Sequence, residues 1–205
     1  MKFSPFGKTF LFSTLFVFMS IDATAQDSQS VFEEVIVTAE KRNESLQSVS
    51  QAVTAITSSE VEAKNIESFV DLSTIVPGVT VAKNEGYKTV ISIRGVGNET
   101  NQNAIAAPSV AYHMDGIFIA SPFSLQTDFI DVERIEIIRG PQGTLFGQNS
   151  TGGAINVISN KPTSGEKYSK ADITLGDYNL RKVRATTNLP ISSSISTKFS
   201  FATTE

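Results

Sequence analysis

Three consecutive segments near the end of the chain alternate between apolar and polar residues, and a period of two predicts β-strands. The apolar positions are Ala171, Ile173 and Leu175 in the first segment, Val183, Ala185, Thr187 and Leu189 in the second, and Ile195, Thr197, Phe199 and Phe201 in the third. Turn-forming residues lie between the segments, at Gly176 to Asn179 and at Pro190 to Ser194. The pattern therefore predicts an antiparallel sheet with one apolar and one polar face.

This alternation is compatible with two kinds of sheet. Each segment is about as long as a strand that crosses an outer membrane at a tilt, in which case the apolar face meets lipid. A soluble antiparallel sheet with one buried face shows the same alternation. The period alone leaves both interpretations open.

The N-terminus has the three parts of a secretory signal peptide, which we place at residues 1–25. Lys2 and Lys8 precede an apolar run from Phe10 to Ile21, and Ala23 to Ala25 supply the small residues of a cleavage site. The apolar run is shorter than the roughly 20 residues that a membrane-spanning helix needs. We therefore expect the chain to be exported.

Composition excludes several classes of function. The 205 residues include no cysteine and one histidine, His113, and the net charge is -4. An exported chain without cysteine has no disulfide framework, and the usual zinc ligand sets cannot be assembled. The mildly acidic balance argues against nucleic-acid binding. We expect no catalytic site, because no nucleophile and base can be paired. We also expect no metal site and no cofactor.

Residues 52–162 are expected to form an α+β domain, a small mixed sheet with short helices and glycine-rich loops. Ser59 and Glu62 have the spacing of a capping box, which predicts one or two short helices that end at Val76, Pro77 and Gly78. Strands are expected at residues 79–82, 89–94, 109–114, 117–120, 134–139 and 154–159.

The segment from Asp131 to Pro162 carries five glycines between two of these strands, at positions 140, 143, 147, 152 and 153. Glycines at this density allow positive φ and close backbone packing. A phosphate-binding loop is disfavoured because no Gly-Lys-Ser or Gly-Lys-Thr occurs and no helix is expected to follow. The "GVGNET" stretch at Gly95 lacks the third glycine of a dinucleotide fingerprint.

Residues 26–51 are mostly polar and charged, and we expect this segment to be flexible. Within it, residues 34–39 have strong β-propensity but no neighbouring strand and no turn signal. The segment therefore looks like a strand that has no partner in its own chain. A leader without a function is the alternative.

Five stretches together resemble the N-terminal part of a TonB-dependent outer-membrane receptor. They are "EEVIVTAEKR" from Glu33, "IVPGV" from Ile75, "ISIRGVG" from Ile91, "YHMDGIFI" from Tyr112, and the Asp131 to Pro162 segment. The resemblance implies that residues 52–162 are the plug domain and residues 163–205 the incomplete start of a transmembrane β-barrel of about 22 strands. His113 departs from the apolar residue usual in the family, and we interpret it as a substitution on the plug sheet.

The resemblance also implies a function. Such receptors take up a bulky nutrient, such as a ferric siderophore, across the outer membrane, and the plug gates the barrel. Residues 34–39 correspond to the TonB box, which is exposed to the periplasm and binds the C-terminal domain of TonB, part of a proton-driven inner-membrane complex. A strand former on a flexible tether suits edge-strand addition to a partner's sheet. The residues expected to bind TonB are Glu34, Val35, Ile36, Val37, Thr38 and Ala39.

Two further sets of residues are candidates by the same resemblance. Arg94 and Arg139, each followed by glycine, are expected to pair with barrel glutamates outside this chain, with Glu136 on the same plug surface, and to act as a plug-barrel latch. Solvated surface arginines are the alternative. Ligand-facing plug loops are expected to present Asn84, Tyr87, Asn98, Asn101, Gln102, Ser121 and Phe123.

A second function stays open at this point. The chain could be a plug-like binding module, or a receptor remnant, that engages TonB without transporting a solute. Further alternating strands after Glu205 would distinguish the importer from this alternative.

Overall fold

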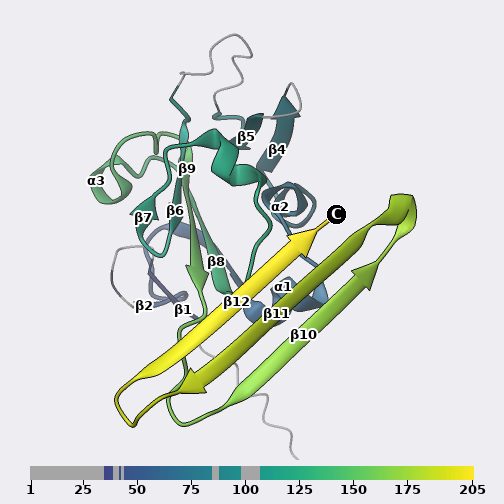
Figure 1. Ribbon diagram of the computed structural model, residues 1–205. Helices are drawn as coiled ribbons and strands as arrows, with labels where there is room; N and C mark the ends of the chain where they lie inside the picture. Colours follow the sequence, from purple (N-terminus) through teal and green to yellow (C-terminus); the bar gives the residue numbers. More distant parts are fainter. Residues whose placement is uncertain (1–34, 39–41, 43, 85–87, 98–106) are drawn as a thin grey trace, which may run out of the picture. The chain divides into compact units, whose positions relative to one another are not determined.

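The computed structural model describes residues 35–38, 42, 44–84, 88–97 and 107–205 (Figure 1). The first elements along the chain are β1 (Ile36–Val37), β2 (Glu44–Ser45), β3 (Ala52–Thr57), α1 (Ser58–Ala63), α2 (Phe69–Ile75), β4 (Val79–Asn84) and β5 (Lys88–Ile93). They are followed by β6 (Val110–Met114), β7 (Ile117–Phe118), η1 (Pro122–Gln126), β8 (Val132–Arg139), α3 (Gly143–Phe146) and β9 (Gly153–Ser159). The last elements are β10 (Tyr168–Leu175), η2 (Asp177–Asn179), β11 (Arg181–Pro190) and β12 (Ser196–Thr204).

Within the described residues, five strands form one mixed sheet in the order β3, β8, β9, β6, β7. All neighbouring strands in it are antiparallel except β6 and β9, which run parallel. β4 and β5 form a separate antiparallel hairpin. The predicted α+β domain with a small mixed sheet is confirmed, and we refer to residues 52–162 as the central domain.

One face of the sheet carries the main hydrophobic core. Ile135 and Ile137 of β8 lie on this face, and Ile155 of β9 is paired with Ile137. Phe69 of α2 covers them and packs edge to face against Tyr112 and Phe129, with ring centroids 4.8 Å apart in both cases. Burial, and then the negative charge of Asp115, raises the pKa of Tyr112 to about 12. Helix α2 and the β4–β5 hairpin therefore lie on this first face, as the buried side chains of both show.

The opposite face of the sheet carries a second, smaller core. Its sheet residues include Ile138, Ala154 and Ala111, which alternate in sequence with the residues of the first face. Val37 of β1 and Phe146 of α3 are buried against them. The sheet therefore has an apolar core on each face, and the second is covered in part by the N-terminal segment.

The helix start was predicted two residues too late. The capping box is formed by Thr57 and Glu60, because Thr57 Oγ1 accepts from Glu60 N–H at 3.4 Å and Thr57 N–H donates to Glu60 Oε2 at 3.2 Å. Ser59, the predicted cap, lies inside α1. The predicted end at Val76 is confirmed, since α2 stops at Ile75 before Pro77.

Three elements of the central domain were not predicted, namely β3, η1 and α3. β3 has the sequence AVTAIT, whose small and hydroxyl side chains gave a weak alternation, yet it pairs along its whole length with β8. The expectation that no helix follows the first glycines is wrong, since Gly143 to Phe146 form the four-residue helix α3 within the loop. The position of α3 follows from Phe146, whose side chain is buried in the second core.

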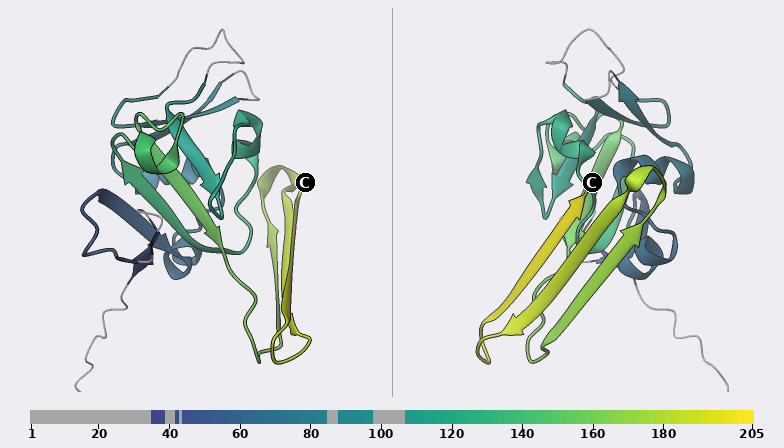
Figure 2. Two further views of the ribbon diagram at one scale, coloured as in Figure 1. Left: turned by 90° about the vertical axis from the view of Figure 1, so that its left-hand side faces the viewer. Right: turned by 45° about the vertical axis from the view of Figure 1, so that its right-hand side comes forward.

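β10, β11 and β12 form an antiparallel sheet with tight connections, which we call the C-terminal sheet (Figure 2). The predicted strands and the turn at Gly176 to Asn179 are confirmed. Ile173 is paired with Val183, and Phe201 with Ala185, so that these residues share one face. This apolar face is exposed, with exposed fractions of 71% for Ile173 and 60% for Phe201. No helix among the described residues has the length and hydropathy needed to cross a bilayer.

Candidate functional site

The expected TonB box is not the unpaired strand that the sequence predicted. Ile36 and Val37 form β1, which pairs with β2 in the register Ile36 to Ser45 and Val37 to Glu44. Leu46 N–H donates to the Val35 carbonyl at 2.9 Å and extends this pairing. Glu34 and Ala39, the ends of the box, lie outside the described residues. The prediction failed because the partner strand is only two residues long and carries no recognisable β-pattern.

Side chains of β1 point in opposite directions. Val37 is fully buried, in contact with the second core of the central domain, whereas Ile36 is 51% exposed. Burying a valine side chain contributes about 1.5–3 kcal/mol relative to leaving it in water. The segment around Val35 to Val37 is therefore held on the sheet by its own apolar residue, and the predicted flexibility does not apply to this stretch.

Thr38 follows β1 and contacts a buried carboxylate. Its N–H donates to Glu136 Oε1 at 2.7 Å, and its hydroxyl donates to Glu136 Oε2 at 2.9 Å. Glu136 has no exposed surface and is also held by Arg134, whose Nε lies 2.9 Å from Oε1. Asn156 on the neighbouring strand donates to Thr38 Oγ1 at 3.3 Å. A buried charge is tolerable here because a cation and several donors surround it.

The predicted placement of Glu136 beside Arg94 and Arg139 is wrong. Glu136 and Arg139 are three residues apart on β8 and point to opposite faces of the sheet, because side chains alternate along a strand. Arg94 is exposed and lies after β5, with a φ of 53° and its N–H donating to the Gly78 carbonyl at 2.6 Å. Glu136 is therefore no part of an outward-facing latch. The expected barrel partners of the two arginines stay a prediction.

A charged interface that the sequence did not predict joins the central domain to the C-terminal sheet. Lys182 Nζ lies 2.8 Å from Glu67 Oε2 and 2.9 Å from Asp128 Oδ2. Lys198 Nζ lies 2.8 Å from Asp131, which also accepts from Ser200 Oγ at 2.9 Å. The residues of the charged interface are Glu67, Asp128 and Asp131 on the central domain, and Lys182, Arg184, which pairs with Glu67, and Lys198 on the sheet.

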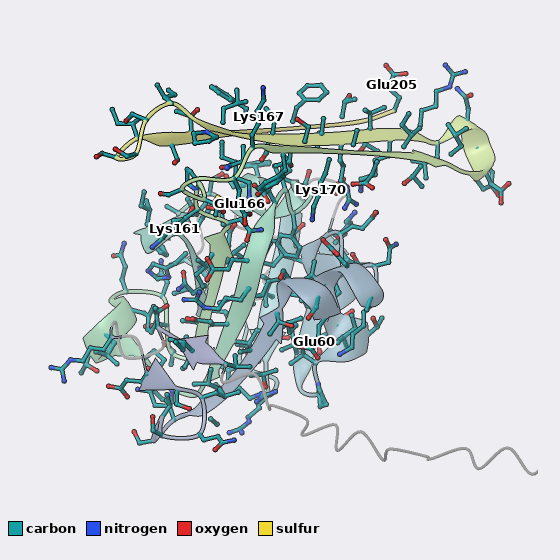
Figure 3. All side chains as sticks on the ribbon, turned by 90° about the horizontal axis from the view of Figure 1, so that it is seen from below. Glu60, Lys161, Glu166, Lys167, Lys170 and Glu205 are labelled. Carbon is teal, nitrogen blue, oxygen red and sulfur yellow. The ribbon has the colours of Figure 1, made fainter. Side chains whose placement is uncertain are left out.

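These contacts involve the polar face of the C-terminal sheet. Lys182 is buried with 4% of its side chain exposed, and Asn188, six residues further along the same face of β11, is fully buried. Asn188 Nδ2 donates to the carbonyls of Thr163 and Glu166, at 2.9 and 2.5 Å, and so fixes the linker before β10. Lys170 of β10 lies on the same face but is exposed, as Figure 3 shows. The alternation predicted this polar face, although its partners could not be read from it.

The predicted ligand-facing residues are only partly described. Ser121 precedes η1 and Phe123 lies within it, and η1 packs against β5. Phe123 is 55% exposed, as a contact residue of a ligand would be. Asn84 ends β4, opposite Lys88 at the start of β5. Tyr87, Asn98, Asn101 and Gln102 lie outside the described residues.

His113 lies in the second core, on β6. Its ring is 5.5 Å from that of Phe118 and 5.2 Å from that of Phe146, measured between centroids. Among the described residues, no group of three or more His, Cys, Asp or Glu side chains is arranged to hold a metal ion. The interpretation of His113 as a packed residue of the sheet agrees with these contacts.

Comparison with known proteins identifies the family. A family model described as "TonB-dependent Receptor Plug Domain" matches residues 45–154. A pesticin receptor from Yersinia pestis is 33% identical over 147 residues, which are 69% of this chain and 21% of that protein. An iron-regulated outer membrane virulence protein from Vibrio cholerae is 32% identical over 167 residues, which are 78% of this chain and 25% of that protein.

Solved structures show the same fold. The ferric yersiniabactin uptake receptor FyuA from Yersinia pestis superposes with a TM-score of 0.65 at 23% identity, over 74% of this chain and 24% of that one. The chain thus spans a quarter or less of the length of these relatives. The family model matches more than half of the chain, and both curated relatives are at least 32% identical over 69% or more of it, so the chain belongs to the TonB-dependent receptor plug domain family.

Proposed function

We propose that this chain is the plug and first barrel strands of an outer-membrane receptor that imports a bulky nutrient, such as a ferric siderophore, with energy delivered by TonB. The relatives support this substrate class, since one is iron-regulated and another is described as a ferric yersiniabactin uptake receptor. In this proposal the central domain gates the barrel, and the segment at Val35 to Thr38 is the TonB box.

The orientation of the C-terminal sheet is the observation that carries the proposal. A soluble sheet buries its apolar face against the neighbouring domain and leaves its polar face in water. Here the polar face contacts the central domain through Lys182 and Lys198, and the apolar face with Ile173 and Phe199 is exposed. Exposed apolar patches of this kind mark contact with a membrane or another protein. A lipid-facing barrel wall around a polar-coated plug fits both faces.

Strand addition is the expected mode of TonB binding. Residues around β1 have strong β-propensity, and an extended peptide can pair with an exposed sheet edge through main-chain hydrogen bonds while side chains give specificity. These hydrogen bonds are spaced along the segment, so that a pulling force on it is shared among them. The signal peptide predicted at residues 1–25 would deliver the protein to the compartment where TonB is reached.

Cysteine crosslinking tests the TonB contact. The chain has no cysteine, so Ile36→Cys introduces a single thiol at an exposed position of β1. We expect a disulfide with a single-cysteine TonB C-terminal domain, detected on a non-reducing gel. Ser193→Cys, in the exposed turn after β11, is the matched control and should give no crosslink. Equal crosslinking at both positions, or none at either, would contradict a specific TonB box.

The latch arginines lead to a second prediction. We propose that Arg94 and Arg139 contact acidic residues of barrel strands beyond this chain, where bidentate pairing is expected. Arg94→Ala with Arg139→Ala should change the free energy of unfolding of this chain by under about 1 kcal/mol, since Arg94 is exposed, Arg139 is half-buried, and charges that reach solvent contribute little. In a complete receptor, the same double variant should increase amide exchange of the plug. Unchanged exchange and unchanged nutrient uptake there would dismiss the latch.

A further inference from the structure

Main-chain groups on both edges of the segment Val35 to Thr38 are hydrogen-bonded within the chain. On one edge β1 pairs with β2, and Leu46 N–H donates to the Val35 carbonyl. Main-chain groups alternate between the two edges of a strand, so the N–H of Thr38 points away from β2. That N–H donates to Glu136 Oε1 at 2.7 Å. A carboxylate of the sheet thus takes the position that a partner's backbone carbonyl would take in strand addition.

Glu136 is well suited to hold this position. It is buried, fixed by Arg134 on its own strand, and faces Asn156 on the adjacent strand, whose Nδ2 lies 3.4 Å from Glu136 Oε2. The Thr38 hydroxyl adds bonds of 2.9 and 3.1 Å to the two carboxylate oxygens. Bonds to an ionised acceptor are shorter and stronger than neutral ones. When Thr38 leaves, the carboxylate loses its N–H and hydroxyl donors together.

Strand addition that uses the Thr38 N–H is incompatible with this arrangement. The Thr38 N–H is already bound to Glu136, and the side chain of Val37 is buried in the second core. A partner strand therefore needs molecules in which the segment has left the sheet. If the fraction of such molecules is small, the apparent affinity for the partner falls by that fraction.

We propose that Glu136 is an intramolecular competitor for the TonB box, so that a strand-adding partner binds only those molecules in which Thr38 has left this carboxylate. The inference rests on the proposed function for the identity of the partner. Its physical content concerns this chain alone: the Thr38 to Glu136 contact, supported by Arg134 and Asn156, sets how often the segment is free.

Amide exchange of the chain in detergent tests the contact without a partner. Thr38→Val keeps the shape and the backbone N–H of residue 38 but removes its hydroxyl, and the loss of hydrogen bonds to a charged group should speed exchange at residues 35–38 and 44–46 by about tenfold. Thr80→Val, at an exposed position of β4, is the control and should leave these rates unchanged. Exchange in β8 and β9 reports whether the sheet stays folded. Unchanged exchange at residues 35–38 in a folded Thr38→Val protein would overturn the proposal.

Binding to the TonB C-terminal domain provides the second arm. A synthetic peptide of residues 34–39 lacks Glu136, so it should bind the TonB C-terminal domain more tightly than the chain does. Thr38→Val in the chain should reduce this difference in affinity. Equal affinity of peptide and wild-type chain would overturn the competition. If neither peptide nor chain binds TonB, the proposed function fails, and the exchange rates still decide whether Glu136 holds the segment.

Discussion

Replacing Gly153 by alanine is expected to lower the free energy of unfolding of the central domain by about 3 kcal/mol or more, from overpacking and backbone strain together. Gly153 begins β9 with a φ of 145°, a conformation that L side chains rarely adopt. A Cβ at this position would lie 2.3 Å from the Ile138 carbonyl oxygen and 3.0 Å from Ile93 Cδ1. The oxygen belongs to the β8 backbone, so relief requires the two central strands to separate.

Gly143→Ala is the matched control for this substitution. A Cβ at Gly143 meets no atom within 4 Å, and the residue starts α3, where alanine is favoured over glycine. We expect a change of about 1 kcal/mol or less, in the stabilising direction. Urea unfolding of both variants in detergent, followed by far-ultraviolet circular dichroism, measures the difference. Equal midpoints for the two variants would show that β8 and β9 are not packed as closely as described.

Local patterns predicted the strands of the fold well, for a physical reason. Alternation along β8, with Ile135 and Ile137 on one face, reflects the burial of that face. This pattern does not depend on which strand is the neighbour of β8. The strand order and the parallel pairing of β6 with β9 depend on contacts between distant residues. No local period contains that information, and the sequence therefore predicted the elements but not the order of the sheet.

The candidate site was predicted less well because its residues depend on tertiary contacts. Residues 34–39 were noticed for their β-propensity and were interpreted as a TonB box by resemblance alone. The burial of Val37 requires the second core, which nothing near residue 37 indicates. Glu136 looked like a surface residue of an alternating strand, since glutamate is rarely buried without a partner. Its partners, Thr38 and Arg134, include one from 98 positions earlier in the chain. A charged residue inside an apolar alternation was the available signal.

The charged interface was not predicted for the same reason, because its partners are brought together only by tertiary contacts. Alternation identified the polar face of the C-terminal sheet, but only the fold brings Glu67 and Asp128 to the same lysine. The polarity of the contact is the reverse of the predicted latch, because here the central domain supplies the acids and the sheet the cations. The charged interface within this chain and the pairing proposed for Arg94 and Arg139 are therefore two separate sets of charges.

Lys182→Met should weaken this contact more than any other single substitution on the sheet. Removing one partner from a fully buried pair costs about 3–5 kcal/mol, and because Glu67 and Asp128 are 28% and 32% exposed we expect about 2–3 kcal/mol here. Lys170→Met, the same change at the exposed lysine of the same face, should cost under about 0.5 kcal/mol. Amide exchange of β11 and urea unfolding in detergent measure both variants. Adding Asp128→Asn to Lys182→Met should restore part of the loss, since Glu67 keeps its pair with Arg184 and the carboxylate left without a cation is removed. A Lys182→Met protein as stable as Lys170→Met would show that the interface contributes nothing to holding the C-terminal sheet on the plug.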